Sequence, residues 1–357
     1  MTDVTVEELQ TRVQEAAAEQ RPLRIRGGGT KDFYGRRVEG EVIDTRGVAG
    51  IVDYEPTELV ITARAGTPLA DLDAAMTDAR QRLPFDPPHF APGATLGGAI
   101  AAGLSGPSRP YAGAVRDFVL GVRMIDGTGE ALRFGGRVMK NVAGFDVARL
   151  MTGSLGTLGI VTEVSLKCLP RPDTETTCVR ECSADESIRL TNEWGGKPLP
   201  LSGTCYLGGR LWVRLSGAAS AVAAACAVIG GDEVADAEAL WSGVRDHTHP
   251  FFTAAQTRGA ALWRLSVRAT TPFTDLGGEQ LIEWGGALRW LTPGDATDPE
   301  RLRSWARGHG GHATCFRGGS GNVFQPLTPP LLALHQRLKH AFDPHGILNR
   351  GRMYAEL

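Results

Sequence analysis

Three glycine-rich stretches hold the residues of this sequence that are best suited to chemistry. The first, Arg26–Lys31 (Arg-Gly-Gly-Gly-Thr-Lys), follows the short apolar run Leu23 to Ile25, and the other two span residues 92–103 and 153–163. Successive glycines let neighbouring N–H groups point the same way, and such a concavity suits phosphate. The pattern predicts that main-chain amides bind an anionic or flat ligand, although any single stretch could also be an ordinary turn.

Two common nucleotide-binding motifs do not occur. A nicotinamide Rossmann fold needs G-x-G-x-x-G between a strand and a helix, but here the first glycine stretch continues into residues 31–35 without helical periodicity. The Walker A pattern G-x-x-x-x-G-K-[ST] is also absent. The sequence therefore disfavours both a nicotinamide enzyme and a P-loop nucleotide triphosphatase.

The order of the glycine stretches, closed by residues 342–353 (Phe-Asp-Pro-His-Gly-Ile-Leu-Asn-Arg-Gly-Arg-Met), resembles one family of flavoproteins. It is the vanillyl-alcohol oxidase and p-cresol methylhydroxylase (PCMH) type of FAD protein. Within that family, the chain is most similar to the FAD-binding subunits of glycolate oxidases (glycolate dehydrogenases), and residues 140–159 match them almost residue for residue. The likeness covers the first half of the chain and its C-terminal end.

The resemblance implies an α+β fold. It implies a PCMH-type FAD-binding domain of two α+β subdomains over residues 1–170, and a smaller α+β cap domain over residues 171–326 that forms the substrate cavity. Residues 327–357 would be a C-terminal helix and tail that return to the FAD domain. The two prolines in Leu169–Asp173, followed by runs rich in tryptophan and arginine, favour a boundary there.

The resemblance also implies a set of FAD-binding residues. The first stretch would wrap the diphosphate, the second would line the flavin and ribityl side, and the third would meet the adenosine end. The implied residues are Arg26, Gly27, Gly28, Gly29, Thr30, Lys31, Gly93, Thr95, Gly97, Gly98, Ala102, Gly103, Ser105, Gly159, Ile160 and Asn349. Arg350 stands where the family has a proline after this asparagine, so the local turn geometry is open.

The mode of flavin attachment can be expected from the same positions. Many relatives attach the flavin covalently through a histidine or cysteine, but the residues here are Thr30, Lys31 and Ser105, which cannot form that link. His89, shortly before the second stretch, is expected to be a solvated loop residue. The FAD is therefore expected to be held non-covalently.

Oxidation of a 2-hydroxy acid needs a cation for the carboxylate and a base for the hydroxyl group. Arginine suits the first task because its planar fork binds a carboxylate through two hydrogen bonds. The cap offers Arg210, Arg214, Arg264, Arg268 and Arg289. His247 and His249 could serve as a base or as a metal-binding pair, but they supply only two ligands. We therefore expect them to lie in a surface loop without a metal. His309 and His312 are likewise expected to lie in a loop. Lys140 and Asn141 are the polar candidates for the reactive side of the flavin, and the catalytic residues stay unassigned.

Composition limits the partners. The formal charge of −2 and a pI near 6.5, without a basic cluster, give no reason to expect nucleic acid or anionic lipid. Six cysteines occur without any C-x-x-C, so no iron–sulfur cluster is expected in the chain itself. The resemblance implies two partners, an iron–sulfur subunit and a paralogous FAD subunit.

The ends of the chain and its apolar stretches indicate where the protein works. The amino terminus lacks the pattern of a secretory signal, and the longest apolar stretch, Ala218 to Ile229, is too short to cross a bilayer. We expect a cytoplasmic protein that meets the inner membrane only through partner subunits. The expected function is that of an FAD-binding subunit which passes electrons from a 2-hydroxy acid to the iron–sulfur partner. The alternatives are a self-sufficient D-lactate or 2-hydroxy acid dehydrogenase, and a flavin-fold scaffold subunit without independent catalysis.

Local patterns predict several elements. A capping box from Thr5 to Glu8 opens a helix through Gln20, and Thr67 caps a helix that starts at Pro68. Residues 118–125 and 130–134 form a hairpin, and residues 160–168 alternate as a half-buried strand. In the C-terminal helix, one stripe holds Leu331, Leu334, Leu338 and Phe342.

Overall fold

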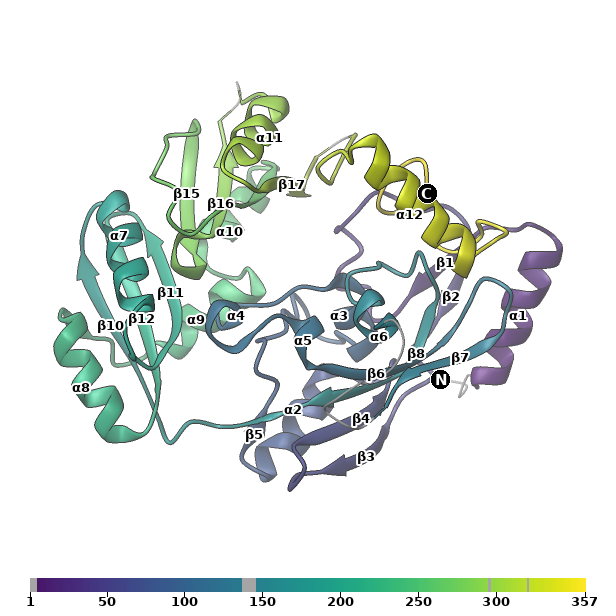
Figure 1. Ribbon diagram of the computed structural model, residues 1–357, viewed down its shortest axis with the longest axis horizontal. Coiled ribbons are helices and arrows are strands. Elements are labelled where there is room, and N and C mark those ends of the chain that lie inside the picture. Colours follow the sequence, from purple (N-terminus) through teal and green to yellow (C-terminus); the bar gives the residue numbers. More distant parts are fainter. Residues whose placement is uncertain (1–4, 137–145, 295–296, 320) are drawn as a thin grey trace. The chain divides into compact units, whose positions relative to one another are not determined.

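The computed structural model describes residues 5–136, 146–294, 297–319 and 321–357. The chain divides into two compact units. The first unit comprises the described residues of Met1–Ser105, Ala114–Pro170 and Pro326–Leu357, and the second those of Gly106–Gly113 and Arg171–Gln325. Both contain helices and sheets (Figure 1), which confirms the predicted α+β class.

A five-stranded antiparallel sheet forms the centre of the first unit. Its order is β3 (Ile51–Glu55), β4 (Val60–Arg64), β8 (Ile160–Lys167), β6 (Val119–Ile125) and β7 (Ala131–Gly135). The predicted hairpin is confirmed as β6 and β7. The expectation that the strand from Ile160 is half-buried is wrong. Because β8 is the central strand, six of its eight residues are buried, on both faces of the sheet, and only Glu163 and Lys167 are half-buried.

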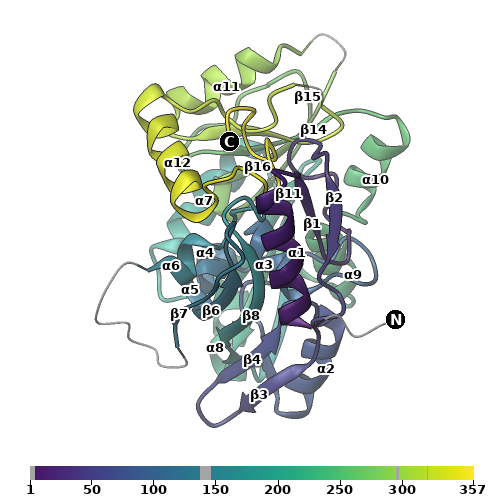
Figure 2. The same cartoon turned by 90° about the vertical axis from the view of Figure 1, so that its right-hand side faces the viewer.

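A parallel pair of strands, β1 (Leu23–Arg26) and β2 (Glu41–Asp44), carries the first glycine stretch at its end. Helix α1 (Val6–Ala18) lies against this pair (Figure 2), where Leu9 and Val13 pack with Leu23 and Ile43. The predicted capping box is confirmed, because the hydroxyl oxygen of Thr5 accepts the N–H of Glu8 at 3.2 Å and the carboxylate of Glu8 accepts the N–H of Thr5 at 3.0 Å. A second pair of strands joins β5 (Gln81–Arg82) to β9 (Leu169–Pro170).

The remaining helices of the first unit are α2 (Leu69–Asp78), α3 (Leu96–Ala102), α5 (Val115–Phe118), α6 (Val147–Leu150) and α12 (Pro329–Phe342). The prediction that Thr67 caps α2 is wrong. Its hydroxyl group donates to the carbonyl of Arg64 at 2.7 Å and accepts the N–H of Gly50 at 2.9 Å, and Pro68 occupies the cap position. In α12 only Leu338 and Phe342 of the predicted stripe are partly buried, whereas Leu331 and Leu334 are exposed.

An eight-stranded antiparallel sheet forms the second unit. Its order is β13 (Asp232–Glu233), β10 (Thr174–Glu181), β12 (Arg210–Gly217), β11 (Leu201–Leu207), β15 (Gly278–Glu283), β16 (Leu288–Pro293), β14 (Leu262–Ser266) and β17 (His312–Arg317). Its helices are α4 (Arg109–Ala112), α7 (Ala184–Gly195), α8 (Ala219–Ile229), α9 (Glu238–Asp246), α10 (Pro250–Thr257) and α11 (Pro299–Gly308). Two apolar clusters support this sheet, one beside α7 and α8 and one beside α11. Across the described ranges, no helix combines the length and the apolar composition that a bilayer crossing requires.

Candidate functional site

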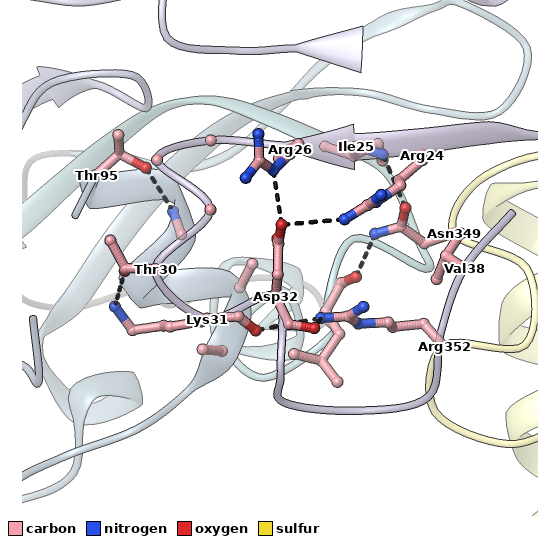
Figure 3. Close-up of a pocket in the computed structure, with 17 residues that line it drawn as sticks. Arg24, Ile25, Arg26, Thr30, Lys31, Asp32, Val38, Thr95, Asn349 and Arg352 are labelled. Atoms are coloured by element: carbon pink, nitrogen blue, oxygen red, sulfur yellow. Dashed lines mark hydrogen bonds and ion pairs between the residues drawn. The ribbon is translucent and has the colours of Figure 1, made fainter. Parts of the chain in front are cut away.

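A cavity of about 90 Å³ lies in the first unit beside the end of β1 (Figure 3). Segments far apart in the sequence meet there: the first glycine stretch, the start of α3, the third glycine stretch and the C-terminal tail. The lining residues are Arg24, Ile25, Arg26, Gly27, Gly28, Gly29, Thr30, Lys31, Asp32, Val38, Thr95, Gly98, Ala101, Ala102, Leu155, Asn349 and Arg352. Because Gly27, Gly28, Gly29 and Gly98 carry no side chain, a ligand can approach the backbone closely at these positions.

The glycine turn packs directly on the segment that precedes α3. A Cβ atom at Gly28 would overlap the carbonyl oxygen of Gly93, and one at Gly27 would lie 2.5 Å from the hydroxyl oxygen of Thr95. Gly29 has a φ of +72°, which side chains rarely adopt. Thr95 is the N-cap of α3 and accepts the N–H of Gly98 at 3.3 Å. The turn can keep this position only with residues that lack a side chain.

The cavity carries a net positive charge. Arg24, Arg26, Lys31 and Arg352 line it with one carboxylate, Asp32. That carboxylate lies 3.0 Å from a terminal nitrogen of Arg24 and 2.7 Å from Nε of Arg26 (Figure 3). Burial lowers the pKa of Arg352, a shift that Asp32 opposes and Arg24 reinforces, yet arginine stays charged at any physiological pH. Such a site attracts an anion.

Arg352 also fixes the path of the glycine turn. Its guanidinium donates to the carbonyls of Lys31 at 3.3 Å, Asp32 at 3.1 Å and Arg36 at 3.1 Å, and the N–H of Arg36 donates back to the carbonyl of Arg352 at 2.8 Å. The C-terminal tail therefore holds the turn in place from one side.

Asn349 joins three segments at the cavity. Its side-chain oxygen accepts the N–H of Ile25 at 2.8 Å, and its amide nitrogen donates to the carbonyl of Leu155 at 2.6 Å. It is buried and adopts a positive φ of 39°, which asparagine tolerates. Arg350 is exposed, and the turn closes through the N–H of Arg352 to the carbonyl of Asn349 at 3.0 Å. The fold thus accommodates an arginine where the family has proline.

A buried ion pair anchors the third glycine stretch to α12. Nζ of Lys339 lies 2.7 Å from a carboxylate oxygen of Asp343 and donates to the carbonyls of Thr157 at 2.8 Å and Leu348 at 2.6 Å. Burial lowers the pKa of Lys339, and Asp343 opposes this shift. The same carboxylate accepts the main-chain N–H groups of Ile347 and Leu348. The third stretch is thereby tied to the tail.

Two family descriptions match the chain: "FAD binding domain" over residues 4–135 and "FAD linked oxidases, C-terminal domain" over residues 324–353. The chain is 50% identical over 345 residues, 97% of its length and 96% of the relative's, to the glycolate oxidase subunit GlcE of Escherichia coli K12. It belongs to the PCMH-type family of FAD-linked oxidoreductases. The flavoprotein is also 34% identical to the glycolate oxidase subunit GlcD of Bacillus subtilis 168, over 44% of this chain and 33% of that one.

A solved structure shows the same fold. Alkyldihydroxyacetonephosphate synthase matches with a TM-score of 0.66 and 16% identity, over 96% of this chain and 75% of that chain. The chain is an FAD-dependent oxidoreductase, and FAD is its cofactor. The cavity fits the anionic part of that cofactor, because it combines close main-chain approach with several cations and a single carboxylate.

The structure brings together many of the residues expected to bind FAD. Those that line the cavity are Arg26, Gly27, Gly28, Gly29, Thr30, Lys31, Thr95, Gly98, Ala102 and Asn349. Gly93, Gly97, Gly103, Ser105, Gly159 and Ile160 lie outside its lining. The lining also includes residues that the sequence did not single out, namely Arg24, Ile25, Asp32, Val38, Ala101, Leu155 and Arg352.

The expected residues outside the lining have structural contacts in the flavoprotein. Gly97 donates its N–H to the carbonyl of Ala65 at 2.7 Å, and Gly103 ends α3 against Gly153. The hydroxyl oxygen of Ser105 accepts the N–H of Val115 at 3.0 Å.

The carbonyl group of Gly93 packs against Gly28, so Gly93 contacts the glycine turn without lining the cavity. A Cβ at Gly159 would overlap the side chain of Met124, and Ile160 is fully buried in the core beside α1. Lys140 and Asn141 lie outside the described residues.

The arginines proposed for substrate binding differ in their surroundings. Arg214 is buried and donates to the hydroxyl groups of Ser108 at 2.7 Å and Ser202 at 3.2 Å, and Arg289 is buried against the carbonyls of residues 271, 272 and 286. Arg210 and Arg268 are exposed. Arg264 is half-buried, with its guanidinium carbon 5.1 Å from the ring centre of Trp284.

Arg109 lies over the same indole ring, at 4.5 Å. Trp284 has a positive φ of 55°, and its Nε1 donates to the carbonyl of Gly106 at 3.1 Å. The following N–H, of Gly285, donates to the hydroxyl oxygen of Thr204 at 2.9 Å. The second unit thus holds two cations beside one firmly positioned aromatic ring.

The histidines of the second unit are part of its framework. The expectation of a surface loop is wrong for His247, which is buried, stacks on Phe252 at 3.9 Å and meets Trp290 edge-on at 4.6 Å. Burial drives its pKa well below 6.5, and Arg317 and Arg264 lower it further. His249 caps α10 by accepting the N–H of Phe251 at 3.3 Å.

The other histidines singled out from the sequence have ordinary surroundings. Nδ1 of His309 lies 2.8 Å from the carbonyl oxygen of Trp305. The loop expected for His312 is wrong, because this residue is exposed on strand β17. His89 is half-buried rather than a solvated loop residue, with Nε2 3.5 Å from a carboxylate oxygen of Asp73. Within the ranges that the structure describes, no three metal-ligating side chains gather at one point.

Proposed function

We propose that this chain is the FAD-binding subunit of a glycolate-oxidising dehydrogenase complex, and that it passes electrons from its flavin to an iron–sulfur partner subunit. The observation that supports this most strongly is the cavity itself, where four distant segments present main-chain amides and cations to one space. The 50% identity to a glycolate oxidase subunit over 97% of the chain indicates the substrate class.

In this proposal the first unit is the FAD-binding domain and the second is the cap. The N–H groups of Gly27 to Gly29, with Arg24, Arg26 and Arg352, bind the diphosphate. Thr95, Gly98 and Ala102 border the ribityl side. Bound FAD supplies a two-electron acceptor that can be reoxidised one electron at a time. The protein's part is to hold that group and to orient it.

The partners follow from the electron path. The cysteines of the chain lack the spacing of a cluster site, so we propose that the one-electron carrier belongs to a separate iron–sulfur subunit. A paralogous FAD subunit is the other proposed member of the complex. We propose a cytoplasmic location, at the inner membrane only through these partners.

For the substrate carboxylate we propose Arg264, with Arg109 beside it, because both guanidinium groups lie over the indole of Trp284. Arg264→Lys keeps the charge but loses the planar fork. In the assembled complex it should raise KM for glycolate at unchanged flavin content, whereas the exposed Arg268→Lys should not. An unchanged KM would assign substrate binding to the paralogous subunit.

The alternative of a self-sufficient D-lactate dehydrogenase has less support. The D-lactate dehydrogenases of Anaerostipes hadrus and Saccharomyces cerevisiae match only 37% and 36% of this chain. A scaffold without flavin is disfavoured, because the cavity combines the glycine turn with four cations and a single carboxylate, an arrangement that suits an anionic ligand.

The test is the absorption spectrum of the purified chain, followed by anaerobic addition of glycolate or D-lactate. We expect a yellow protein whose flavin is released on denaturation, and bleaching by glycolate once the paralogous FAD subunit and the iron–sulfur subunit are added. A colourless protein would support the scaffold. Bleaching of the isolated chain by D-lactate would support the self-sufficient enzyme.

A further inference from the structure

The solvent side of α12 carries apolar side chains that the first unit does not cover. Leu331 is 47% exposed and Leu334 is 43% exposed, and the two lie one turn apart on the helix. Exposed large apolar residues are few among the described residues, and isolated ones need no explanation. A pair on one helix face, beside a hollow, is different.

The hollow is a cavity of about 180 Å³ between α12, the third glycine stretch and the C-terminal tail. Its apolar lining comes from Leu150, Leu158, Leu338, Met353 and Leu357, with His335 at the edge next to Leu331. It shares no lining residue with the cofactor cavity. Leu334 lies one helical turn before Leu338, which lines the hollow. We call the two exposed leucines together with this hollow the α12 surface.

The charges around the α12 surface are mainly basic. Residues 329–342 contain no aspartate or glutamate, whereas Arg337 is exposed on the helix and Arg350 on the tail that follows. Glu356, next to Leu357, is the exposed carboxylate of that tail. The chain as a whole carries a formal charge of −2, so this basic border departs from the average. A partner that fits must offer apolar side chains flanked by carboxylates.

We propose that the α12 surface docks another subunit of the oxidoreductase complex, through an amphipathic segment whose apolar residues enter the hollow beside Leu338 and whose acidic residues face Arg337. The proposal rests on the proposed function for the existence of that complex. It adds the place on this chain where the partner binds, and the chemistry of the partner's side. Helix-to-groove contacts of this kind are a common mode of recognition.

Two other occupants fit less well. A second copy of this chain would bring two basic borders together, which is unfavourable. A lipid surface is disfavoured because the exposed face of α12 carries only two large apolar side chains and no tryptophan or phenylalanine.

The test compares the double variant L331D/L334D with Gln336→Asp, which introduces the same kind of charge at an exposed position on the opposite side of α12. Each chain is co-expressed with the paralogous FAD subunit and the iron–sulfur subunit. Retention of these subunits, their affinity and the flavin absorbance of this chain are then measured.

We expect the double variant to bind the partner subunits at least tenfold more weakly, the Gln336→Asp variant to bind them like the wild type, and all three proteins to keep their flavin. The wild-type affinity should fall with rising salt. Wild-type affinity in the double variant would overturn the proposal. The proposal would also be overturned if the wild-type chain self-associated, or bound phosphatidylglycerol vesicles, and only the double variant lost that property. A colourless wild-type chain that still binds the partners would instead overturn the proposed cofactor function and leave the docking surface supported.

Discussion

At the scale of single residues, the cofactor cavity depends on contacts that exclude side chains. Gly28→Ala is expected to weaken FAD binding at least tenfold, about 1.4 kcal/mol, because its Cβ would overlap the carbonyl oxygen of Gly93 and push the turn away from α3. Titration of the apoprotein with FAD, followed by flavin fluorescence, measures the change. Gly195→Ala on α7 is the matched control, since nothing lies within 4 Å of its Cβ. Equal FAD affinities for the two variants would show that the turn does not bind the cofactor.

His247 gives the second unit a dependence on pH. Its ring is buried among aromatic side chains and stays neutral, since its pKa lies well below 6.5 in the folded protein. In the unfolded chain a histidine takes up a proton near pH 6.5. Below that pH only the unfolded state is protonated, so stability is lost as the pH falls.

The expected loss from this one group is about 1.4 kcal/mol between pH 7.5 and 5.5. Urea unfolding followed by tryptophan fluorescence at several pH values measures it, and His247→Phe should reduce the slope by that amount. The absolute stability of the variant is expected to be lower, since His247 has a φ of +57°, which phenylalanine adopts at a cost. A slope that survives in His247→Phe would assign the pH dependence to other groups, such as His249 or His312.

At the scale of elements, the buried ion pair of Lys339 and Asp343 connects α12 to the third glycine stretch and should contribute strongly to the stability of the first unit. Lys339→Met leaves the buried carboxylate of Asp343 without its cation and frees the carbonyls of Thr157 and Leu348. Breaking a buried pair from one side typically costs about 3 kcal/mol, and we expect a loss of that size in urea unfolding.

A matched pair in the second unit provides the control. Lys197 and Glu193 have the same spacing of four residues and a distance of 2.6 Å, but both side chains are about half exposed. Lys197→Met should leave stability unchanged within error. Adding Asp343→Asn to Lys339→Met should recover part of the loss, because the buried charge is then removed. Equal stabilities for Lys339→Met and the wild type would contradict a structural role of the pair.

The elements also show what the sequence can predict. The helix opened by Thr5 and the hairpin of β6 and β7 depend on neighbouring residues, and local patterns predicted both. The position of the glycine turn came from the order of motifs. Arg352 was missed because it reaches the turn only when the C-terminal tail returns to β1. Arg24 and Asp32 were missed because their ion pair forms only when the glycine turn folds back beside β1. Thr67 was assigned to the wrong role because its hydroxyl group bonds Gly50, in the connection before β3, and Arg64, at the end of β4.

At the scale of the whole molecule, the cofactor cavity is built from both ends of the chain. Asn349 and Arg352 approach the turn at Lys31 across about the full length of the sequence, while residues 171–325 form a separate core. FAD binding should therefore stabilise the first unit without a direct effect on the core of the second. Such a difference can be measured if each unit has its own probe.

The chain supplies that probe, because all seven tryptophans, at positions 194, 212, 241, 263, 284, 290 and 305, belong to the second unit. At an FAD concentration a hundred times the Kd, the first unit should gain about 2.7 kcal/mol. We expect the unfolding transition seen by flavin release to move to higher temperature with added FAD, and the transition seen by tryptophan fluorescence to stay in place. The Gly28→Ala variant should lose at least half of the first shift, because tenfold weaker binding leaves about 1.4 kcal/mol at the same FAD concentration, and it should keep the second transition. If both transitions move together in the wild type, the two units unfold as one cooperative body, and the cap contributes to the stability of the cofactor site.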